Sequence, residues 1–135
     1  MKFILDVNVL IAWGWTDHSD FLRVRQWISQ TVKEKSTQLI TTPITQLGFI
    51  RISVHRSSNE LSIIEASKIL DERVQFLGAR HQFISDSIQS LHFPSWCKSA
   101  NQTTDAHLLK LAESHHAKLA TLDEKIPHAF IIPKI

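Results

Sequence analysis

The chain opens with Lys2-Phe-Ile-Leu-Asp-Val-Asn-Val-Leu-Ile-Ala-Trp-Gly-Trp15. Lys2–Leu5 is a short, largely apolar run, which predicts a buried strand. Val9–Trp15 is also apolar and predicts a short helix that leads away from a turn at Asp6. An aspartate directly after a buried strand costs free energy unless its carboxylate is paired or bound to a metal ion. This stretch therefore predicts the first strand and helix of an α/β fold, with a carboxylate at their junction.

Helix and strand patterns alternate along the rest of the chain. Thr42 followed by Pro43 predicts a helix start, and Gly78 predicts a helix end. Strands that alternate with helices favour a parallel sheet with right-handed crossovers, so we predict an α/β fold in a single domain over residues 1–135. The expected elements are a helix from Phe21 to Ser36-Thr37, a strand over Gln38–Thr41, a helix from Thr42 to about Val54, a helix from an Asn59 cap to Gly78, a strand over His81–Ile84, a loop over 85–104, a helix from a Thr103 or Thr104 cap to about His115, and strands over Lys118–Thr121 and His128–Ile132.

The composition is that of a globular protein. Apolar residues make up 43% and charged residues 21% of the 135 residues, so the chain is not of the disordered type. The single cysteine, Cys97, has no partner for an internal disulfide, which favours a cytoplasmic location. We find no signal peptide and no apolar stretch of membrane-spanning length, so we expect no membrane association. A net charge of +2 with eight histidines is compatible with a polyanionic partner but does not require one.

Three aspartates lie where strands or helices are expected to begin or end. Asp6 follows the first strand, Asp105 lies in the first turn of the last helix, and Asp123 follows the strand that ends at Thr121. Open parallel sheets bind ligands at the carboxyl ends of their strands, where we expect these side chains to meet. Two unit charges about 4 Å apart repel by roughly 4 kcal/mol at an effective dielectric of about 20, so three carboxylates together require a cation. The cluster predicts a hard-metal site that acts on a phosphate ester.

Each aspartate alone also has an ordinary structural explanation. Asp6 is suited to cap the helix that follows it. Asp105 lies where the positive end of a helix dipole favours a carboxylate by roughly 0.3–1 kcal/mol. Asp123 lies in a turn, where aspartate forms local hydrogen bonds. The metal-site hypothesis depends on their joint placement and not on any single position.

Four segments resemble the PIN-domain ribonuclease family, in particular the VapC-type toxins of bacterial toxin–antitoxin pairs. They are Leu5–Trp13, Thr42–Arg51, Thr103–Ala112 and Ala120–Asp123. Their order and spacing match the family over nearly the whole chain. The resemblance implies a compact three-layer α/β/α fold with a short parallel sheet. It also implies endonucleolytic cleavage of RNA that depends on Mg²⁺ or Mn²⁺, and partnership with a cognate antitoxin protein.

The same resemblance assigns Asp6, Asp105 and Asp123 as catalytic residues and metal ligands. Two further residues are auxiliary candidates on chemical grounds. Asn8 is suited to fix the Asp6 carboxylate, and Thr121 is suited to hydrogen-bond within the cluster or to be an ordinary strand residue.

One position departs from the family pattern. Many PIN domains have a glutamate early in the helix that Thr42 begins, in the segment that reads Thr45-Gln46-Leu47-Gly48 here. Gln46 keeps an acceptor oxygen but loses the charge. We keep it as an auxiliary candidate that ligates directly or through a water, beside the alternative that it is an ordinary helix residue. The departure leaves the number of metal ions, one or two, open.

Three residues are candidates for contact with RNA. Arg51 and Arg56 lie towards the end of the Gln46 helix, where they either meet phosphates or are simply solvated. Trp96 lies in the 85–104 loop, and a loop of this length in a compact domain is often functional. Its ring is suited to stack on an unpaired base.

The first helix also suggests a partner surface. The expected strands and helices already contain ample Leu, Ile and Val for a core, so part of the aromatic and apolar surface is expected to lie outside. Exposed apolar patches usually mark partner sites. The family resemblance implies both a homodimer and an inhibitory antitoxin, so we predict that this surface supports a dimer and that an antitoxin segment lies across the groove near Asp6. The residues of this surface are Val9, Leu10, Ile11, Trp13, Trp15, Phe49 and Ile50.

Two other functions fit parts of the pattern. Asp6-Val7-Asn8 after the first strand also resembles phosphotransferases that use a strand-end aspartate as nucleophile, although these usually have a second aspartate where Asn8 stands and a supporting lysine. Alternatively, the missing carboxylate at Gln46 leaves a PIN fold that binds partners without catalysis. A trapped phosphoenzyme on Asp6 would indicate the first function, and absence of metal-dependent cleavage the second.

Overall fold

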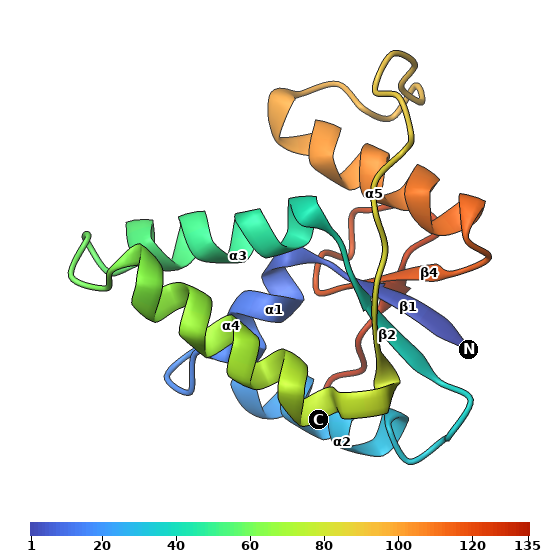
Figure 1. Ribbon diagram of the computed structural model, residues 1–135. Coiled ribbons are helices and arrows are strands. Elements are labelled where there is room, and N and C mark those ends of the chain that lie inside the picture. Colours follow the sequence, from blue (N-terminus) through green and yellow to red (C-terminus); the bar gives the residue numbers. More distant parts are fainter.

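Five parallel strands, with helices on both faces of the sheet, make up the computed structural model, which describes residues 1–135 (Figure 1). This confirms the predicted three-layer α/β/α fold. In space the strands follow the order β3-β2-β1-β4-β5, and they are β1 (Lys2–Leu5), β2 (Gln38–Thr41), β3 (His81–Phe83), β4 (Lys118–Thr121) and β5 (Phe130–Ile131). The helices are α1 (Val7–Gly14), α2 (Phe21–Thr31), α3 (Pro43–Arg56), α4 (Ile63–Leu77) and α5 (Thr103–Ser114), with short 3₁₀ turns η1 (Gly78–Arg80) and η2 (Ala100–Gln102).

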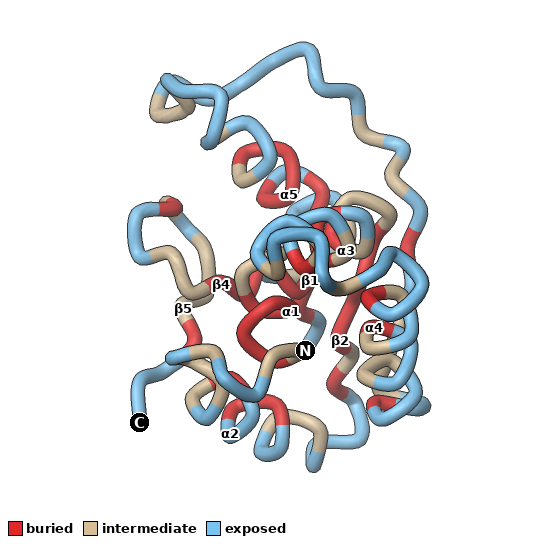
Figure 2. The backbone as a smooth tube through the Cα atoms, turned by 90° about the vertical axis from the view of Figure 1, so that its left-hand side faces the viewer, coloured by how far each residue is buried: buried red, intermediate tan, exposed pale blue.

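Alternate side chains of each central strand enter opposite layers of the core. Phe3 and Leu5 of β1 pack into a cluster that reaches α1, α2, α3 and α4. Ile4 faces the other way and packs against Leu108 and Leu111 of α5. Both faces of the strands are therefore buried, as is usual for parallel sheets. Figure 2 shows the buried stretches of β1, β2, β4 and α1 gathered in the middle of the molecule.

The order of the strands determines where a site can form. The chain passes from β1 to β2 through α1 and α2, whereas α5, on the opposite face, leads into β4 on the other side of β1. The carboxyl ends of β1 and β4 are therefore a switch point, which is where open α/β sheets bind ligands. Asp6 follows β1 and Asp123 follows β4, so the topology brings both aspartates to this point.

Capping boxes fix the starts of α3 and α4. As predicted, Thr42 caps α3, and it exchanges hydrogen bonds of 3.2 and 2.9 Å with Thr45. The predicted Asn59 cap of α4 is wrong, because Ser62 caps this helix. Asn59 instead adopts a positive φ of 65° in the preceding turn, a conformation that asparagine tolerates better than most residues.

Several other boundaries differ from the prediction. Thr103 is the first helical residue of α5, and the turn η2 leads into it, so neither Thr103 nor Thr104 is its cap. Three elements are shorter than predicted: α2 ends at Thr31, β3 ends at Phe83 and β5 covers only Phe130–Ile131.

None of the helices is both long and apolar enough to cross a membrane.

Part of the α1 surface was expected to lie outside, but only Trp15 and Ile50 are half-buried and the rest is buried. Trp13 is only 4% exposed and Phe49 only 1% exposed, and Val9, Leu10 and Ile11 are buried too. They are buried because α1 packs against α2, α3 and β4. The large apolar side chains that do lie outside belong to other surfaces, and on α3 and α4 they are Leu47, Ile52, Ile63, Ile64 and Phe76.

Candidate active site

A cavity of about 500 Å³ opens at the carboxyl ends of β1 and β4. The three predicted acids, Asp6, Asp105 and Asp123, all line it, although they come from distant parts of the chain. Asn8 and Arg51 line it as well. The structure therefore brings the predicted acids together with one auxiliary candidate and one candidate for RNA contact.

Asp6 combines the two roles that the sequence left open. Its Oδ1 accepts a hydrogen bond of 2.7 Å from the Val7 backbone N–H, which caps α1 and starts the helix two residues before the predicted Val9. Its Oδ2 accepts a hydrogen bond of 2.8 Å from the Thr121 hydroxyl. Burial and, to a smaller extent, the charge of Asp123 raise the pKa of the Asp6 carboxyl, while the hydrogen bonds from Thr121 and Val7 oppose this rise.

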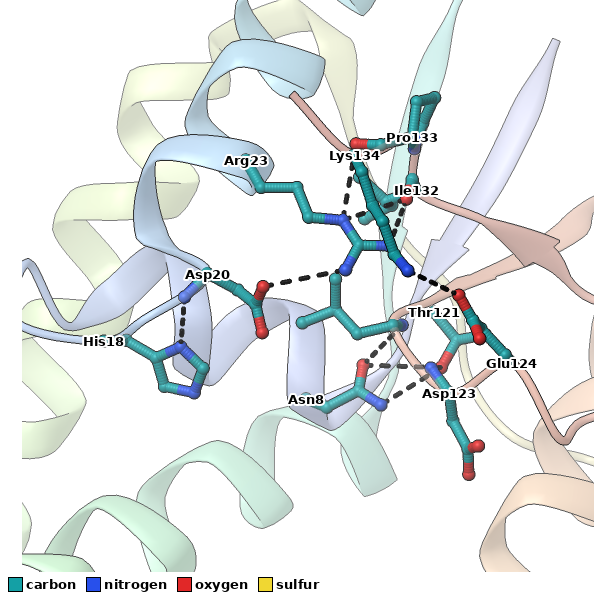
Figure 3. Close-up of polar contacts among 11 residues, drawn as sticks. Asn8, His18, Asp20, Arg23, Thr121, Asp123, Glu124, Ile132, Pro133 and Lys134 are labelled. Atoms are coloured by element: carbon teal, nitrogen blue, oxygen red, sulfur yellow. Dashed lines mark hydrogen bonds and ion pairs between the residues drawn. The ribbon is translucent and has the colours of Figure 1, made fainter.

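Thr121, fully buried at the end of β4, connects the parts of the site. Besides donating to Asp6, its Oγ1 accepts hydrogen bonds of 3.1 Å from Asn8 Nδ2 and 3.1 Å from the Asp123 backbone N–H. Asn8 Oδ1 accepts a further hydrogen bond of 3.2 Å from the Leu122 backbone N–H. Figure 3 shows Asn8 turned towards Thr121 and the turn that carries Asp123. One hydroxyl thus fixes the ends of β1, α1 and β4 relative to each other.

Asp105 is half-exposed in the first turn of α5 and lines the cavity with the other two acids. Burial and then the charges of Asp6 and Asp123 raise the pKa of the Asp105 carboxyl to about 6. The backbone N–H of Lys125 donates a 2.9 Å hydrogen bond to Asp123 Oδ1, so this aspartate also forms the local turn that was the alternative explanation. The three carboxylates therefore repel one another through the cavity.

The donors at this site fit a hard divalent cation. The three acids offer only oxygen atoms, which Mg²⁺ and related ions prefer, and a cation relieves the repulsion that raises the pKa of Asp105. No three His, Cys, Asp or Glu side chains lie close enough to enclose an ion as they stand. Such enclosure is not required, because Mg²⁺ usually keeps several waters and takes only one or two carboxylates.

Gln46 does not line the cavity. Its Nε2 donates a hydrogen bond of 3.0 Å to Thr41 Oγ1, which lies 2.7 Å from His81 Nε2. Burial lowers the pKa of His81, which favours the neutral ring. Gln46 therefore belongs to a network at the ends of β2 and β3, outside the acid cluster.

The three candidates for RNA contact lie in different places. Arg51 is exposed and lines the acid cavity. Arg56 forms an ion pair of 3.6 Å with Asp17 and stacks 4.6 Å from the centre of the Trp15 ring. Trp96 is half-buried and lines a separate cavity of about 430 Å³ beside α5. Only Arg51 is therefore placed beside the three acids.

Sequence analysis missed two residues that line the acid cavity, His18 and Asp20. Both lie in the turn between α1 and α2. The backbone N–H of Asp20 donates a hydrogen bond of 3.0 Å to His18 Nδ1, and the Asp20 carboxylate lies 3.6 Å from the Arg23 guanidinium. The only signal in the sequence is a polar turn between two apolar helices, and it does not say on which side of the sheet the turn lies.

A second polar network anchors the 85–99 loop to α5, and sequence analysis missed this network too. His107 is only 8% exposed, and its Nε2 lies 2.5 Å from Asp86 Oδ2. Its Nδ1 lies 2.7 Å from the Ser90 hydroxyl. The network holds the loop against the helix whose first turn carries Asp105.

Comparison with known proteins agrees with this geometry. The family model described as PIN domain matches residues 3–130. Ribonuclease VapC39 of Mycobacterium tuberculosis is 34% identical over 127 residues, which cover 91% of this chain and 89% of that protein. Ribonuclease VapC44 of the same organism is 34% identical over 131 residues, which cover 93% and 89%. A crystal structure of VapBC2 from Rickettsia felis, bound to a DNA fragment from their promoter, shares the fold with a TM-score of 0.60, 16% identity and 96% coverage of both chains. The chain therefore belongs to the PIN-domain family, among the VapC ribonucleases.

Proposed function

We propose that this protein is a metal-dependent endoribonuclease that hydrolyses phosphodiester bonds in RNA and acts as the toxin of a type II toxin–antitoxin system. The observation that carries the proposal is the convergence of Asp6, Asp105 and Asp123 on one cavity at the switch point between β1 and β4, in a chain of the VapC ribonuclease family. Because its substrate is cellular RNA, we place the protein in the cytoplasm.

In this proposal the three aspartates hold one or two Mg²⁺ or Mn²⁺ ions through their oxygens. An ion held by Asp6, Asp105 and Asp123 would supply a Lewis acid beside the scissile phosphate, and would lower the pKa of a bound water. The Thr121 hydroxyl holds the Asp6 carboxylate in one orientation. Asn8 ties Thr121 to the first turn of α1, so the acids keep their geometry when the substrate enters.

Arg51 is the residue best placed to meet the RNA backbone. It is exposed at the cavity that the acids line, and a guanidinium binds phosphate oxygens with two parallel hydrogen bonds. Contacts of this kind position the chain without reading its sequence. Arg56 is already engaged by Asp17 and Trp15, and Trp96 lies beside a different cavity, so we do not place them at the scissile phosphate.

The environment of Asp6 disfavours the phosphotransferase alternative. Both of its carboxylate oxygens accept hydrogen bonds, and the residue is only 4% exposed. Each oxygen keeps a further lone pair for a metal ion, but an attack on phosphorus requires a carboxylate that is exposed enough to reach the phosphoryl group. The alternative of a binding module without catalysis is decided by the cleavage assay below.

We further propose two protein partners, a cognate antitoxin and a second copy of this chain. A solved structure that shares this fold is that of VapBC2, which supports the antitoxin. The homodimer is supported by exposed apolar side chains, since such surfaces usually mark partner sites. Light scattering on the isolated chain tests it, and a monomer at high concentration would contradict it. The side chains concerned on α3 and α4 are Leu47, Ile52, Ile63, Ile64 and Phe76.

Cleavage of labelled total RNA by the purified protein tests the proposed function. We expect discrete products with Mg²⁺ or Mn²⁺, none with EDTA, and a near-complete loss of cleavage in Asp105→Asn and Asp123→Asn. The matched control is Asp71→Asn, which changes an exposed aspartate on α4 and should cleave as the parent does. Cleavage that persists in EDTA, or no cleavage with any divalent ion, would contradict the proposal.

A further inference from the structure

His18 is the one histidine that lines the acid cavity. It lies in the turn between α1 and α2, far in the sequence from Asp105 and Asp123. Figure 3 shows the His18 ring at the left of the view, Asn8 near the centre and Asp123 to the right. His18 therefore reaches the cavity of the acids from a different segment of the chain.

A local hydrogen bond determines which nitrogen of the His18 ring carries the proton. The backbone N–H of Asp20 donates to Nδ1 at 3.0 Å, so Nδ1 is an acceptor and has no hydrogen. In a neutral imidazole the other nitrogen, Nε2, is then the N–H donor. No protein group accepts a hydrogen bond from Nε2 in this structure, so that donor is available to a ligand in the cavity. An Nε2 that carries its hydrogen has no lone pair for a metal ion, which argues against His18 as a metal ligand.

The turn that holds His18 is anchored through Asp20 and Arg23. The Asp20 carboxylate lies 3.6 Å from Arg23, whose side chain is mostly buried. Arg23 Nε donates hydrogen bonds to the backbone carbonyls of Ile132 at 3.0 Å and Pro133 at 3.3 Å, and its Nη2 also donates to Ile132 (Figure 3). The turn is thus tied to the segment that follows β5. A donor on a fixed scaffold loses little freedom when it binds a ligand.

The negative charge of the cavity means that a phosphate needs hydrogen-bond donors to bind there. Four aspartates line the cavity, and the carboxylates of Asp6, Asp105 and Asp123 repel a phosphodiester as they repel one another. Asp20 adds little to this repulsion, because Arg23 pairs with it. Arg51 is the one cationic side chain that lines the cavity, so a second hydrogen-bond donor to the phosphate offsets part of the repulsion.

We propose that His18 is a further catalytic residue, whose Nε2–H donates a hydrogen bond to a non-bridging oxygen of the RNA phosphate beside the acid cluster. Asp20 and Arg23 are positioning residues that act through His18. The inference rests on the proposed ribonuclease function and adds a residue to that same site.

Kinetics with substituted proteins test the contact. We expect His18→Ala to lower kcat/KM for RNA cleavage about 10- to 100-fold, which is the effect of one hydrogen bond to a charged group. His18→Gln keeps an amide N–H at a similar distance from the backbone and should recover part of the loss. The matched control is His92→Ala, an exposed histidine beside the other cavity, which should cleave as the parent does. Parent-like cleavage by His18→Ala would overturn the proposal.

Two measurements without cleavage separate this inference from the function on which it rests. Calorimetry with Mn²⁺ should give the same affinity for His18→Ala and the parent, and a clear loss of affinity would make His18 a metal ligand and overturn the proposal. NMR of the ¹⁵N-labelled imidazoles should show the Nε2–H tautomer, and its signal should shift when a short RNA is added in EDTA. An Nδ1–H tautomer, or a signal that RNA leaves unchanged, would overturn the proposal. If the parent does not cleave RNA at all, the proposed function fails, and the NMR result still decides whether His18 contacts phosphate.

Discussion

Thr121 donates its hydroxyl proton to the Asp6 carboxylate across 2.8 Å, although 115 positions separate the two residues in the chain. This hydrogen bond joins the end of β4 to the end of β1 at the switch point of the sheet. It also opposes the rise in the pKa of Asp6 that burial causes, so it helps to keep the carboxylate ionised. The charge and the orientation of the most buried acid therefore depend on a residue that is itself uncharged.

The first prediction concerns this hydroxyl. Thr121→Val keeps the shape of the side chain but leaves a buried carboxylate without its donor. We expect the free energy of unfolding to fall by about 1–3 kcal/mol, and cleavage of RNA to fall at least tenfold. Urea denaturation in EDTA and a cleavage assay measure the two effects. Thr121→Ser, which keeps the hydroxyl, is the control and should retain most of both. A Val variant as stable and as active as the parent would show that the hydrogen bond does not matter.

The second prediction concerns the pH dependence of the metal-free protein. The pKa of Asp105 is raised from 3.8 to about 6, so folding favours its protonated form. The protonated Asp105 carboxyl gives its full contribution to the free energy of unfolding below pH 3.8. This contribution is lost as the pH rises to about 6. Asp105→Asn removes the titrating group, so the variant should gain in Tm relative to the parent across this window. Thermal melts in EDTA over a series of pH values measure the difference. Two curves that stay parallel would mean that folding does not raise the pKa of Asp105.

The third prediction concerns the stabilisation of the fold by metal. A ligand that binds only the folded protein at 100 times its Kd adds about 2.7 kcal/mol to the free energy of unfolding. At a pH above the pKa of Asp105, we therefore expect Mn²⁺ to raise the Tm of the parent. It should raise the Tm of Asp105→Asn much less. Asp71→Asn again serves as the control with an unchanged response. An equal rise in the parent and in Asp105→Asn would indicate that the ion binds elsewhere.

The sequence was sufficient to predict the acid cluster, because each acid is attached to a regular element. Asp6 directly follows β1, Asp123 lies two residues after β4, and Asp105 lies in the first turn of α5, so the rule for parallel sheets places them together. The rule for parallel sheets does not say where residues on irregular segments lie. His18 enters the cavity only because α1 is eight residues long and runs in a particular direction, which no local pattern specifies.

The directions of side chains and the closeness of helix packing could not be predicted from the sequence either. Gln46 is in the predicted helix, but its amide donates to Thr41 and does not line the cavity. Part of the α1 surface was expected outside, yet α2, α3 and β4 cover most of it. A Cβ atom at Gly48 would lie 2.6 Å from Val7 Cγ2. The absence of a side chain at Gly48 thus permits the close approach of α3 to the first turn of α1.

The fourth prediction follows from this contact. Gly48→Ala should force α3 away from the first turn of α1, and overpacking of this kind costs about 1–3 kcal/mol. Val7→Ala creates space at the same place, so the double variant should be more stable than the sum of the single effects allows. Chemical denaturation of all four proteins measures the coupling. Strictly additive effects would mean that the helices adjust without strain.

The last prediction separates the two arginines of α3. Arg51 lines the acid cavity, whereas Arg56 is engaged by Asp17 and the Trp15 ring. We expect Arg51→Ala to weaken binding of a short single-stranded RNA and to reduce the slope of log affinity against log salt by about 0.7, the effect of one lost phosphate contact. Arg56→Ala should leave that slope unchanged and should instead lower stability by roughly 0.5–1 kcal/mol, because it loses the cation–π contact. Fluorescence anisotropy in EDTA, over a range of salt concentrations, measures binding without cleavage. A salt slope that falls in Arg56→Ala and not in Arg51→Ala would reverse the assignment, and the RNA would then have to pass over the outer end of α3 and not over the acids.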